Sequence, residues 1–235
     1  MEIKGFIGVS LSDWDRKVSS VIFLPGCNLR CPFCYNKGLV LHPEKMPAVS
    51  QGQIEEYLET NQKWIDGVVI TGGEPTIHAD LPQLCDKIKK RGYNVKVDTN
   101  GTNPTMIRRL LENQLVNYVA LDVKAPLTEE KYAEACGICA AQFLKKIKET
   151  IKMLMNDAVD CEFRTTLVPT LHHTEDVEKI CRTLKGCKKY ALQNFKSDAE
   201  TLNPKYQGLK PFSKTQMEGF LQAAKKIVPN AVIRS

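Results

Sequence analysis

The chain has 235 residues, of which 43% are hydrophobic and 26% charged. This composition excludes a disordered chain, and the length suits one globular domain. The net charge of +6 is spread over interleaved basic and acidic residues, which does not favour a nucleic-acid-binding surface. The apolar runs are too short to span a membrane, and nine cysteines without a signal peptide predict a soluble protein of the reducing cytoplasm.

The first 18 residues contain many turn formers and predict an ordered lead-in rather than a targeting peptide. Residues 19–24 form an apolar, β-branched run that stops at Pro25-Gly26, and this run predicts the first buried strand. A cysteine-rich loop, residues 27–36, follows directly.

Helical and strand patterns alternate along the rest of the chain. We expect helices near 50–62, 80–90, 104–112, 128–135, 141–156, 174–184 and 213–227, and further strands near 67–71, 94–98, 118–122, 161–168 and 189–192. Strands alternating with helices predict a parallel sheet, and six such units fall short of a closed eight-unit barrel. We therefore predict an α/β fold, an open partial (β/α)6 TIM-like barrel. The expected single domain, 1–235, has a lead-in (1–18), a barrel core (19–195) and a C-terminal loop and helix (196–235).

The loop after the first strand carries Cys27, Cys31 and Cys34 at Cys-x3-Cys-x2-Cys spacing. A [4Fe-4S] cluster is usually held by four thiolates, so a loop with three leaves one iron open to a substrate. Taken alone, the loop is also compatible with a structural zinc site that uses a distant fourth cysteine, or with three buried thiols that have no chemical role.

Three further motifs follow predicted strands, at the end where barrel enzymes gather their catalytic loops. The segment 71–75, Thr-Gly-Gly-Glu-Pro, frees the backbone to approach a ligand, although a tight turn with a helix-capping acid has the same pattern. The segment 98–101, Asp-Thr-Asn-Gly, offers oxygen ligands for a ribose or a hard cation, or a generic turn. Asp122 and Lys124 alternate and so face one side of an extended chain, where a surface ion pair is the plainer interpretation.

Together these motifs resemble those of the radical S-adenosylmethionine (SAM) superfamily, including the aromatic residue Phe33 before the last cysteine of the loop. The resemblance implies that Cys27, Cys31 and Cys34 hold a [4Fe-4S] cluster whose fourth iron binds SAM. It also implies reductive cleavage of SAM to a 5′-deoxyadenosyl radical, and the same partial barrel. Such chemistry belongs to the cofactor, while the protein supplies position and containment.

The motifs around Asp98 and Asp122 resemble, more specifically, those of the glycyl-radical-enzyme activases. This branch includes the activators of pyruvate formate-lyase and of anaerobic ribonucleotide reductase. The resemblance implies a glycyl radical enzyme as protein substrate, a flavodoxin or ferredoxin-type electron donor, and a monovalent-cation site at Asp98, Thr99 and Asp122. The SAM contacts that it implies are Phe33, Tyr35, Asn36, Gly72, Gly73, Glu74, Asp98, Asn100, Asp122, Lys124 and Arg164.

Two departures refine the resemblance. Tyr35 stands where many of these activases have histidine, and Gln193-Asn194 stands near the position of a SAM-contacting histidine in the pyruvate formate-lyase activator. With Gly5-Phe6 near the start, this pattern favours the ribonucleotide-reductase-activator branch. The alternatives are a small-molecule radical SAM enzyme, such as a 7-carboxy-7-deazaguanine synthase, and a non-enzymatic zinc or iron-sulfur binding module.

The remaining cysteines and histidines give weaker signals. Cys136 and Cys139 form a Cys-x2-Cys pair, but no second pair completes an auxiliary metal site. Cys85 is expected to be an ordinary buried thiol. His172 and His173 follow a strand at the active end, but loop histidines are commonly solvated, so neither is assigned to the site.

Overall fold

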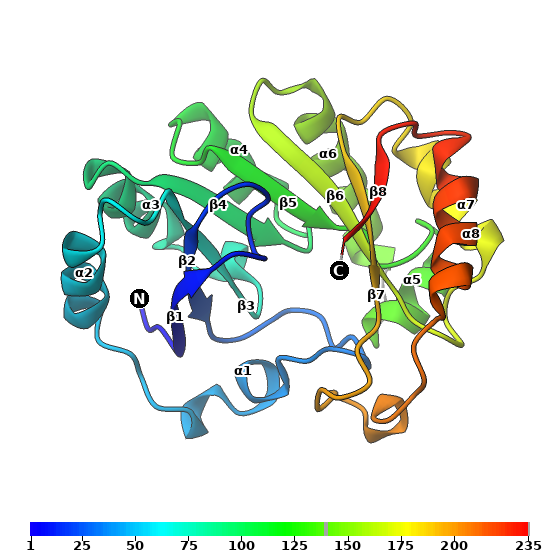
Figure 1. Ribbon diagram of the computed structural model, residues 1–235, viewed down its shortest axis with the longest axis horizontal. Helices are drawn as coiled ribbons and strands as arrows, with labels where there is room; N and C mark the ends of the chain where they lie inside the picture. Colours follow the sequence, from blue (N-terminus) through cyan, green and yellow to red (C-terminus); the bar gives the residue numbers. More distant parts are fainter. Residues whose placement is uncertain (139–140, 235) are drawn as a thin grey trace. The chain divides into compact units, whose positions relative to one another are not determined.

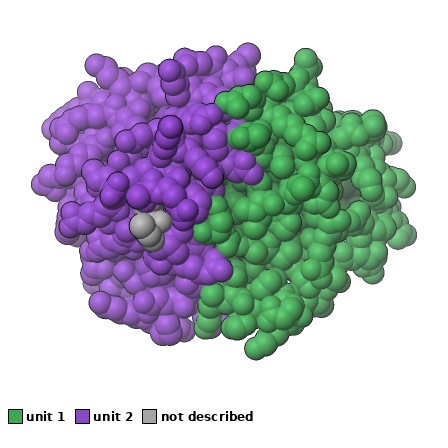
Figure 2. Space-filling model, turned by 180° about the vertical axis from the view of Figure 1, so that it is seen from behind, with its two compact units in different colours: residues 1–28, 36–99, 105–119 green, residues 29–35, 100–104, 120–235 purple. Residues whose placement is uncertain are grey.

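Figure 1 shows the computed structural model of the chain, in which residues 1–138 and 141–234 are described. The strands of the described part follow one another in the sheet in chain order, from β1 to β8. The chain divides into two compact units (Figure 2): unit 1 comprises residues 1–28, 36–99 and 105–119, and unit 2 comprises residues 29–35, 100–104 and 120–235. Within the described residues, no helix has the length and apolar character needed to cross a bilayer.

Unit 1 contains the first four strands. Strand β1 (Gly5–Ser10) pairs antiparallel with β2 (Ser19–Leu24), and β2, β3 (Gly67–Gly72) and β4 (Asn94–Thr99) are parallel neighbours. The helical elements of this part of the chain are α1 (Lys37–Leu41), η1 (Pro43–Lys45), α2 (Gln51–Thr60), η2 (Pro75–Ile77), α3 (Leu81–Lys90) and α4 (Pro104–Glu112).

The core of unit 1 explains why its sequence adopts these elements. Val68, Val69 and Ile70 in β3 are completely buried, as expected for a parallel strand that is covered on both faces. Helix α3 buries Leu81, Leu84 and Ile88 on one face and places lysines elsewhere. Burial of these apolar faces holds the helices against the sheet.

Unit 2 contains the rest of the sheet. Strand β5 (Tyr118–Asp122) enters this unit at Ala120, and β6 (Asp160–Leu167), β7 (Tyr190–Asn194) and β8 (Ala231–Arg234) are parallel neighbours. The helical elements are α5 (Glu129–Cys136), α6 (Ala141–Asn156), α7 (Thr174–Thr183), η3 (Pro204–Tyr206) and α8 (Lys214–Lys225). Helix α6 buries the apolar side chains of Leu144, Ile147, Ile151 and Leu154.

The structure confirms the predicted α/β class, with an open and mostly parallel sheet whose strands alternate with helices. It differs at both ends of the chain, where the expected lead-in contains β1 and the expected C-terminal loop and helix is followed by β8. Both are edge strands of the sheet. In β1, Ile7 and Val9 are 43% and 52% exposed, so the segment lacks the continuous buried run that identifies a central strand. Strand β8 has only four residues, too few for a clear pattern.

Candidate functional site

The predicted site residues lie in β6 or at the carboxyl ends of β2 to β5 and in the loops that follow them. They are divided between the two units. Unit 1 contains Cys27, Asn36, Gly72, Gly73, Glu74, Asp98 and Thr99, and unit 2 contains Cys31, Phe33, Cys34, Tyr35, Asn100, Asp122, Lys124 and Arg164.

In unit 1, the glycine pair at the end of β3 lies against the start of the cysteine loop. The Gly73 amide donates to the Leu24 carbonyl at 2.9 Å, and the Asn36 side-chain amide donates to the Gly72 carbonyl at 2.6 Å. A Cβ atom on Gly73 would lie 1.7 Å from the Gly26 carbonyl oxygen. Only glycine permits this approach, which ties the two loops together beside Cys27.

Glu74 is buried, with 1% of its surface exposed. Its Oε1 accepts from the Thr76 amide at 3.1 Å, from the Thr76 hydroxyl at 2.5 Å and from the Thr99 hydroxyl at 2.7 Å. Glu74 also caps η2, which is the capping arrangement considered as the alternative interpretation of this motif. The carboxylate therefore joins the loop after β3 to the end of β4, and its contact with SAM stays a prediction.

At the end of β4, Asp98 faces a lysine that the sequence analysis did not single out. Lys96 is completely buried, and its Nζ lies 3.5 Å from Asp98 Oδ1. The same ammonium donates to the main-chain oxygen of Asp13 and lies 5.4 Å from the centre of the Tyr118 ring. Lys96 could have been identified from the sequence, because it lies between Val95 and Val97 in a buried strand. A lysine rarely enters a core without partners.

The side chain of Asn100 stabilises a local turn in unit 2. Its Oδ1 accepts from the Thr102 amide at 3.0 Å and from the Thr102 hydroxyl at 2.6 Å. This is the asparagine turn that was the plainer interpretation of the Asp-Thr-Asn-Gly motif. A contact between Asn100 and SAM remains a prediction.

The part of the cysteine loop that belongs to unit 2 is well packed. Cys31 and Phe33 are buried, and Cys34 is half-buried. A hydrogen bond with the Cys136 thiol and the positive charge of Lys124 lower the pKa of Cys31, although burial opposes them. A thiol with a lowered pKa is a better metal ligand, because the thiolate is the form that binds.

Helix α5 ends against this loop. The Arg30 amide donates to the Cys136 carbonyl at 2.9 Å. Gly137, the next residue, has a φ of 67°, and a Cβ atom there would lie 2.0 Å from the Arg30 carbonyl oxygen. The close approach requires glycine and places the end of α5 directly beside the loop.

The chain that follows β7 also supports the cysteine loop. The Leu202 amide donates to the Cys34 carbonyl at 2.9 Å, and the Asn203 amide donates to the Pro32 carbonyl at 2.8 Å. Two main-chain hydrogen bonds therefore hold the segment between the second and third predicted cluster ligands.

Tyr35 is anchored to the same part of the chain. Its hydroxyl accepts from the Lys196 amide at 2.6 Å, and its ring lies 5.7 Å from that of Phe195. Burial raises the pKa of the Tyr35 hydroxyl. These contacts give Tyr35 a structural role, and the SAM contact implied by its position stays a prediction.

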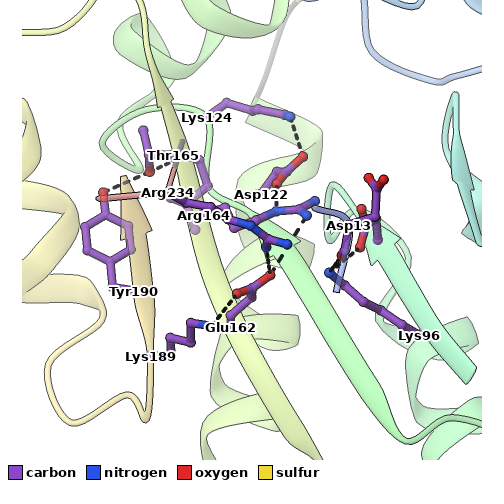
Figure 3. A network of polar contacts seen from close by, with 12 residues as sticks. Asp13, Lys96, Asp122, Lys124, Glu162, Arg164, Thr165, Lys189, Tyr190 and Arg234 are labelled. Atoms are coloured by element: carbon purple, nitrogen blue, oxygen red, sulfur yellow. Dashed lines mark hydrogen bonds and ion pairs between the residues drawn. The ribbon is translucent and has the colours of Figure 1, made fainter. Parts of the chain in front are cut away.

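An ion-pair chain in unit 2 joins three predicted site residues (Figure 3). Lys124 Nζ lies 2.9 Å from Asp122 Oδ2, and Arg164 Nε donates to Asp122 Oδ1 at 2.7 Å. Burial alone would raise the pKa of Asp122, but the positive charges of Arg164 and Lys124 hold it well below its usual range. Burial would lower the pKa of Lys124, and the negative charge of Asp122 reverses this shift. The surface ion pair considered earlier is therefore a partly buried network.

Glu162 extends this network and was not predicted from the sequence. It is 1% exposed, and its carboxylate lies 2.7 Å from Arg234 Nη1, 3.3 Å from Lys189 Nζ and 4.0 Å from Arg164 Nη1. Figure 3 shows these side chains converging from β6, from β8 and, for Lys189, from the residue before β7. Glu162 and Arg164 are two residues apart on β6 and so share one face of the strand. Glu162 thereby holds the arginine that also pairs with Asp122.

His172 is buried rather than solvated, in contrast to the expectation for a loop histidine. Its Nδ1 accepts from the Val168 amide at 3.0 Å, which leaves Nε2 as the donor to the Lys124 carbonyl at 2.8 Å. Burial lowers the pKa of the His172 imidazole. The neutral ring thus fixes the main chain at Lys124, a role that sequence reasoning missed.

Four cysteines outside the loop differ from Cys31. Burial raises the pKa of Cys85 and Cys181 to about 12 and that of Cys161 and Cys187 to about 11. Cys139, one half of the suggested auxiliary pair, lies outside the described residues. In the part of the chain that is described, no group of three or more His, Cys, Asp or Glu side chains is arranged to hold a metal ion.

Comparison with known proteins identifies the family. The model of the radical SAM superfamily matches residues 21–186. A protein of Methanocaldococcus jannaschii named "Putative glycyl-radical enzyme activating enzyme MJ1227" is 34% identical over 234 residues, which cover 99% of this chain and 95% of that protein. The 7-carboxy-7-deazaguanine synthase of Aquifex aeolicus is 39% identical, but only over 84 residues, 36% of this chain and 36% of that enzyme.

Among solved structures, Streptococcus suis SuiB bound to S-adenosylmethionine superposes with a TM-score of 0.68 at 15% identity. The match covers 92% of this chain but only 52% of SuiB, so the chain spans about half the length of that protein. At this identity the likeness concerns the fold alone. The family model covers most of the chain, and the similarity to the M. jannaschii protein extends over nearly all of it. The chain therefore belongs to the radical SAM superfamily.

Proposed function

We propose that this chain is a glycyl-radical-enzyme activase and that anaerobic ribonucleotide reductase is its first candidate partner. The observation that carries the proposal is the 34% identity with a named activating-enzyme relative over 99% of this chain and 95% of that protein. The motifs at Asp98, Asp122 and Arg164 support the same branch. Membership of the superfamily implies a [4Fe-4S] cluster and SAM as its cofactors.

The thiols of the chain fit such a cluster chemically. Iron-sulfur clusters are held by cysteine thiolates, and the pKa of Cys31 is lowered. We assign Cys27, Cys31 and Cys34 as the ligands. The burial of Phe33 and the main-chain hydrogen bonds at Cys34 would keep the loop in one conformation when the cluster binds.

In this proposal, basic residues of the ion-pair network in unit 2 bind SAM. Arg164 and Lys124 are held in place by Asp122, and either cation can attract the methionine carboxylate of SAM. The backbone groups of Gly72 and Gly73 and the side chains of Asn36, Glu74, Asp98 and Asn100 are assigned to the rest of SAM. The chemistry that bound cluster and SAM supply in this family is one-electron cleavage of SAM to methionine and a 5′-deoxyadenosyl radical, which takes a hydrogen atom from the target glycine.

A protein substrate also suits the fold. The sheet is open, with β1 and β8 at its edges, and we propose that an extended loop of the partner enters the site and shields it from water. The activating-enzyme relative has a similar length, since 234 aligned residues make up 95% of it. We further propose a single functional domain in the cytoplasm and a flavodoxin or ferredoxin-type protein as electron donor.

Electron paramagnetic resonance tests the proposed activity. We expect slow SAM cleavage by the reduced, anaerobic enzyme alone, and a stable glycyl radical when the anaerobic ribonucleotide reductase or a related glycyl radical enzyme of the same organism is added. The control partner carries an alanine in place of its radical glycine and should give no signal.

The alternative is a small-molecule radical SAM enzyme such as a 7-carboxy-7-deazaguanine synthase, favoured by the local 39% identity with the A. aeolicus enzyme. Stoichiometric turnover of a purine-like substrate, together with no organic radical on any glycyl radical enzyme of the organism, would establish this alternative instead.

Cysteine variants test the cluster assignment separately from the partner. We expect Cys27→Ala, Cys31→Ala and Cys34→Ala each to lose the cluster, because each removes one of three thiolates from the site. Cys85→Ala, at a buried thiol in helix α3, is the matched control and should keep its iron. Iron analysis and visible absorbance after anaerobic purification measure the result. A triple variant that kept a SAM-cleaving cluster would contradict the assignment.

A further inference from the structure

Both carboxylates assigned to a monovalent-cation site are already paired with basic side chains. Asp98 lies 3.5 Å from the ammonium of Lys96 in unit 1. Asp122 lies 2.9 Å from Lys124 and 2.7 Å from Arg164 in unit 2. A metal ion bound to either carboxylate would meet a positive charge within a few ångströms, and like charges at this distance repel. The charges of Lys96, Lys124 and Arg164 therefore disfavour the additional cation that the resemblance implies.

The ammonium of Lys96 is surrounded by groups that attract a cation. Its Nζ donates to the main-chain oxygen of Asp13, faces the Asp98 carboxylate and lies 5.4 Å from the centre of the Tyr118 ring. A carbonyl oxygen and a carboxylate oxygen are also the ligands of hard cations, and an aromatic face attracts any cation. The ammonium thus occupies a site with the properties of a monovalent-cation site.

Lys96 is fixed in this position rather than mobile. The side chain is completely buried in β4, between the buried residues Val95 and Val97. The Tyr118 ring lies 5.7 Å from Trp14, which packs in an apolar cluster with Val21 and Val69. A side chain enclosed in this way cannot move its charge into solvent.

The carbonyl that accepts from Lys96 belongs to an ordered turn. The Ser10 hydroxyl donates to Asp13 Oδ2 at 2.5 Å, and the Asp13 amide donates to Ser10 Oγ at 3.3 Å. The turn follows β1 and presents the Asp13 main-chain oxygen to Lys96 (Figure 3). The edge strand that the sequence analysis missed therefore helps to build the lysine site.

We propose that the Lys96 ammonium is the permanent counter-cation of Asp98 and takes the place of a bound sodium or potassium ion. SAM binding by this chain then does not require a monovalent metal ion. Lys96 is a positioning residue, since it acts through Asp98 and is not itself assigned to SAM. The link to SAM rests on the proposed role of Asp98, whereas the replacement of the ion by Lys96 does not.

The first test uses the wild-type, cluster-loaded enzyme under anaerobic conditions. SAM affinity is measured in sodium, potassium and N-methylglucamine chloride at equal ionic strength, so that only the identity of the cation changes. We expect the dissociation constants to agree within about threefold, because no ion has to bind with SAM. A larger gain in affinity with sodium or potassium would overturn the proposal.

The second test asks whether removing the ammonium creates a metal site. Lys96→Met keeps an unbranched apolar side chain but removes the ammonium, which leaves Asp98 without this counter-charge. We expect the variant to bind thallium(I), a potassium substitute observed by ²⁰⁵Tl NMR, and to gain several degrees of thermal midpoint on addition of potassium. Wild-type protein should show neither effect. The control Lys90→Met, at a lysine whose side chain is 74% exposed, should behave as the wild type.

A third variant keeps the test decisive if Lys96→Met folds poorly. Lys96→Met combined with Asp98→Asn removes both charges, and we expect it to be stable without added cations and indifferent to thallium(I). Bound thallium(I) in the wild type, or a Lys96→Met protein whose stability and thallium(I) spectrum are unaffected, would overturn the proposal. These readouts do not involve a partner or SAM, so they separate a failure here from a failure of the proposed activity.

Discussion

Two buried glutamates, one in each unit, contact different kinds of group. Glu74 and Glu162 are each 1% exposed. Glu74 accepts hydrogen bonds from one amide and two hydroxyl groups. Glu162 is surrounded by Arg164, Lys189 and Arg234. Equal burial therefore does not mean an equal electrostatic environment.

The difference has energetic consequences. A single hydrogen bond contributes about 1 kcal/mol net, so the contacts of Glu74 can be weakened one at a time. A buried ionic group depends on all its partners, because removing the counter-charge leaves the others uncompensated, at about 3 to 5 kcal/mol. Substitutions of the partners of Glu74 should therefore cost less than substitution of Glu162.

The largest effect is expected for Glu162→Gln, which keeps the shape of the side chain but leaves three basic groups without their shared anion. We expect the free energy of unfolding to fall by about 3 to 5 kcal/mol. Urea unfolding measures it. Glu178→Gln, which removes an exposed pair with Arg182, is the control and should cost less than about 1 kcal/mol. Similar losses in the free energy of unfolding of the two variants would show that charge pairing at Glu162 contributes little to stability.

A smaller effect is expected for SAM affinity when one charge is removed from either unit. Asp98→Ala in unit 1 and Lys124→Ala in unit 2 should each weaken SAM binding by about 1 to 3 kcal/mol, because each removes a polar partner from the proposed site. Iron content should stay largely intact in both. Equilibrium binding to the anaerobic enzyme checks the affinity, and unchanged affinity in both variants would contradict their assignment to SAM.

The pH dependence of stability tests the ionic character of unit 2. The pKa of Asp122 is lowered in the folded chain, so its stabilising contribution is complete above the unfolded pKa, about 3.9, and declines as the pH falls below it. The stability difference between wild type and Asp122→Asn should therefore be constant from pH 7 to about pH 5 and should shrink toward pH 3. Chemical unfolding across this range gives the profile, and a difference independent of pH would refute the ionic explanation.

The smallest effect is expected for Thr76→Val, which removes one hydroxyl donor from Glu74. We expect a loss of about 0.5 to 1.5 kcal/mol in the free energy of unfolding. Thr183→Val, at an exposed threonine whose hydroxyl donates to the Lys179 carbonyl, is the matched control. A loss as large as that of Glu162→Gln would remove the contrast between the two glutamates.

The same contrast explains what the sequence could and could not predict. The bounds of α6 and β2 agree with the predicted ranges, because the pattern of each lies in consecutive residues. The partner of Glu74 is also local, since Thr76 follows two residues later. The partners of Glu162 are distant in the sequence, since Arg234 follows it by 72 residues. Lys96 and its acceptor Asp13 are likewise 83 residues apart. Only the folded chain brings such residues together.

The edge strands show a second limit of prediction. Strand β1 carries the exposed side chains Ile7 and Val9, and β8 carries Val232 and Ile233, which are also exposed. A half-covered edge strand does not give the continuous apolar run of a central strand. The positions of the cysteine, Gly-Gly-Glu and Asp-Thr-Asn-Gly motifs at strand ends were predicted well, because each follows a strong central strand.

The main-chain bonds from Leu202 and Asn203 to the cysteine loop also constrain the order of events during synthesis. A ribosome makes Cys31 and Cys34 long before it makes these residues, and before the α5 residue Cys136 that accepts from Arg30. A nascent chain that has only reached β4 therefore has the thiols but not the hydrogen bonds that hold their loop. Under the proposed assignment of these cysteines to the cluster, we expect iron loading into the ordered loop only after residue 203 has been synthesised, late in the maturation of each molecule.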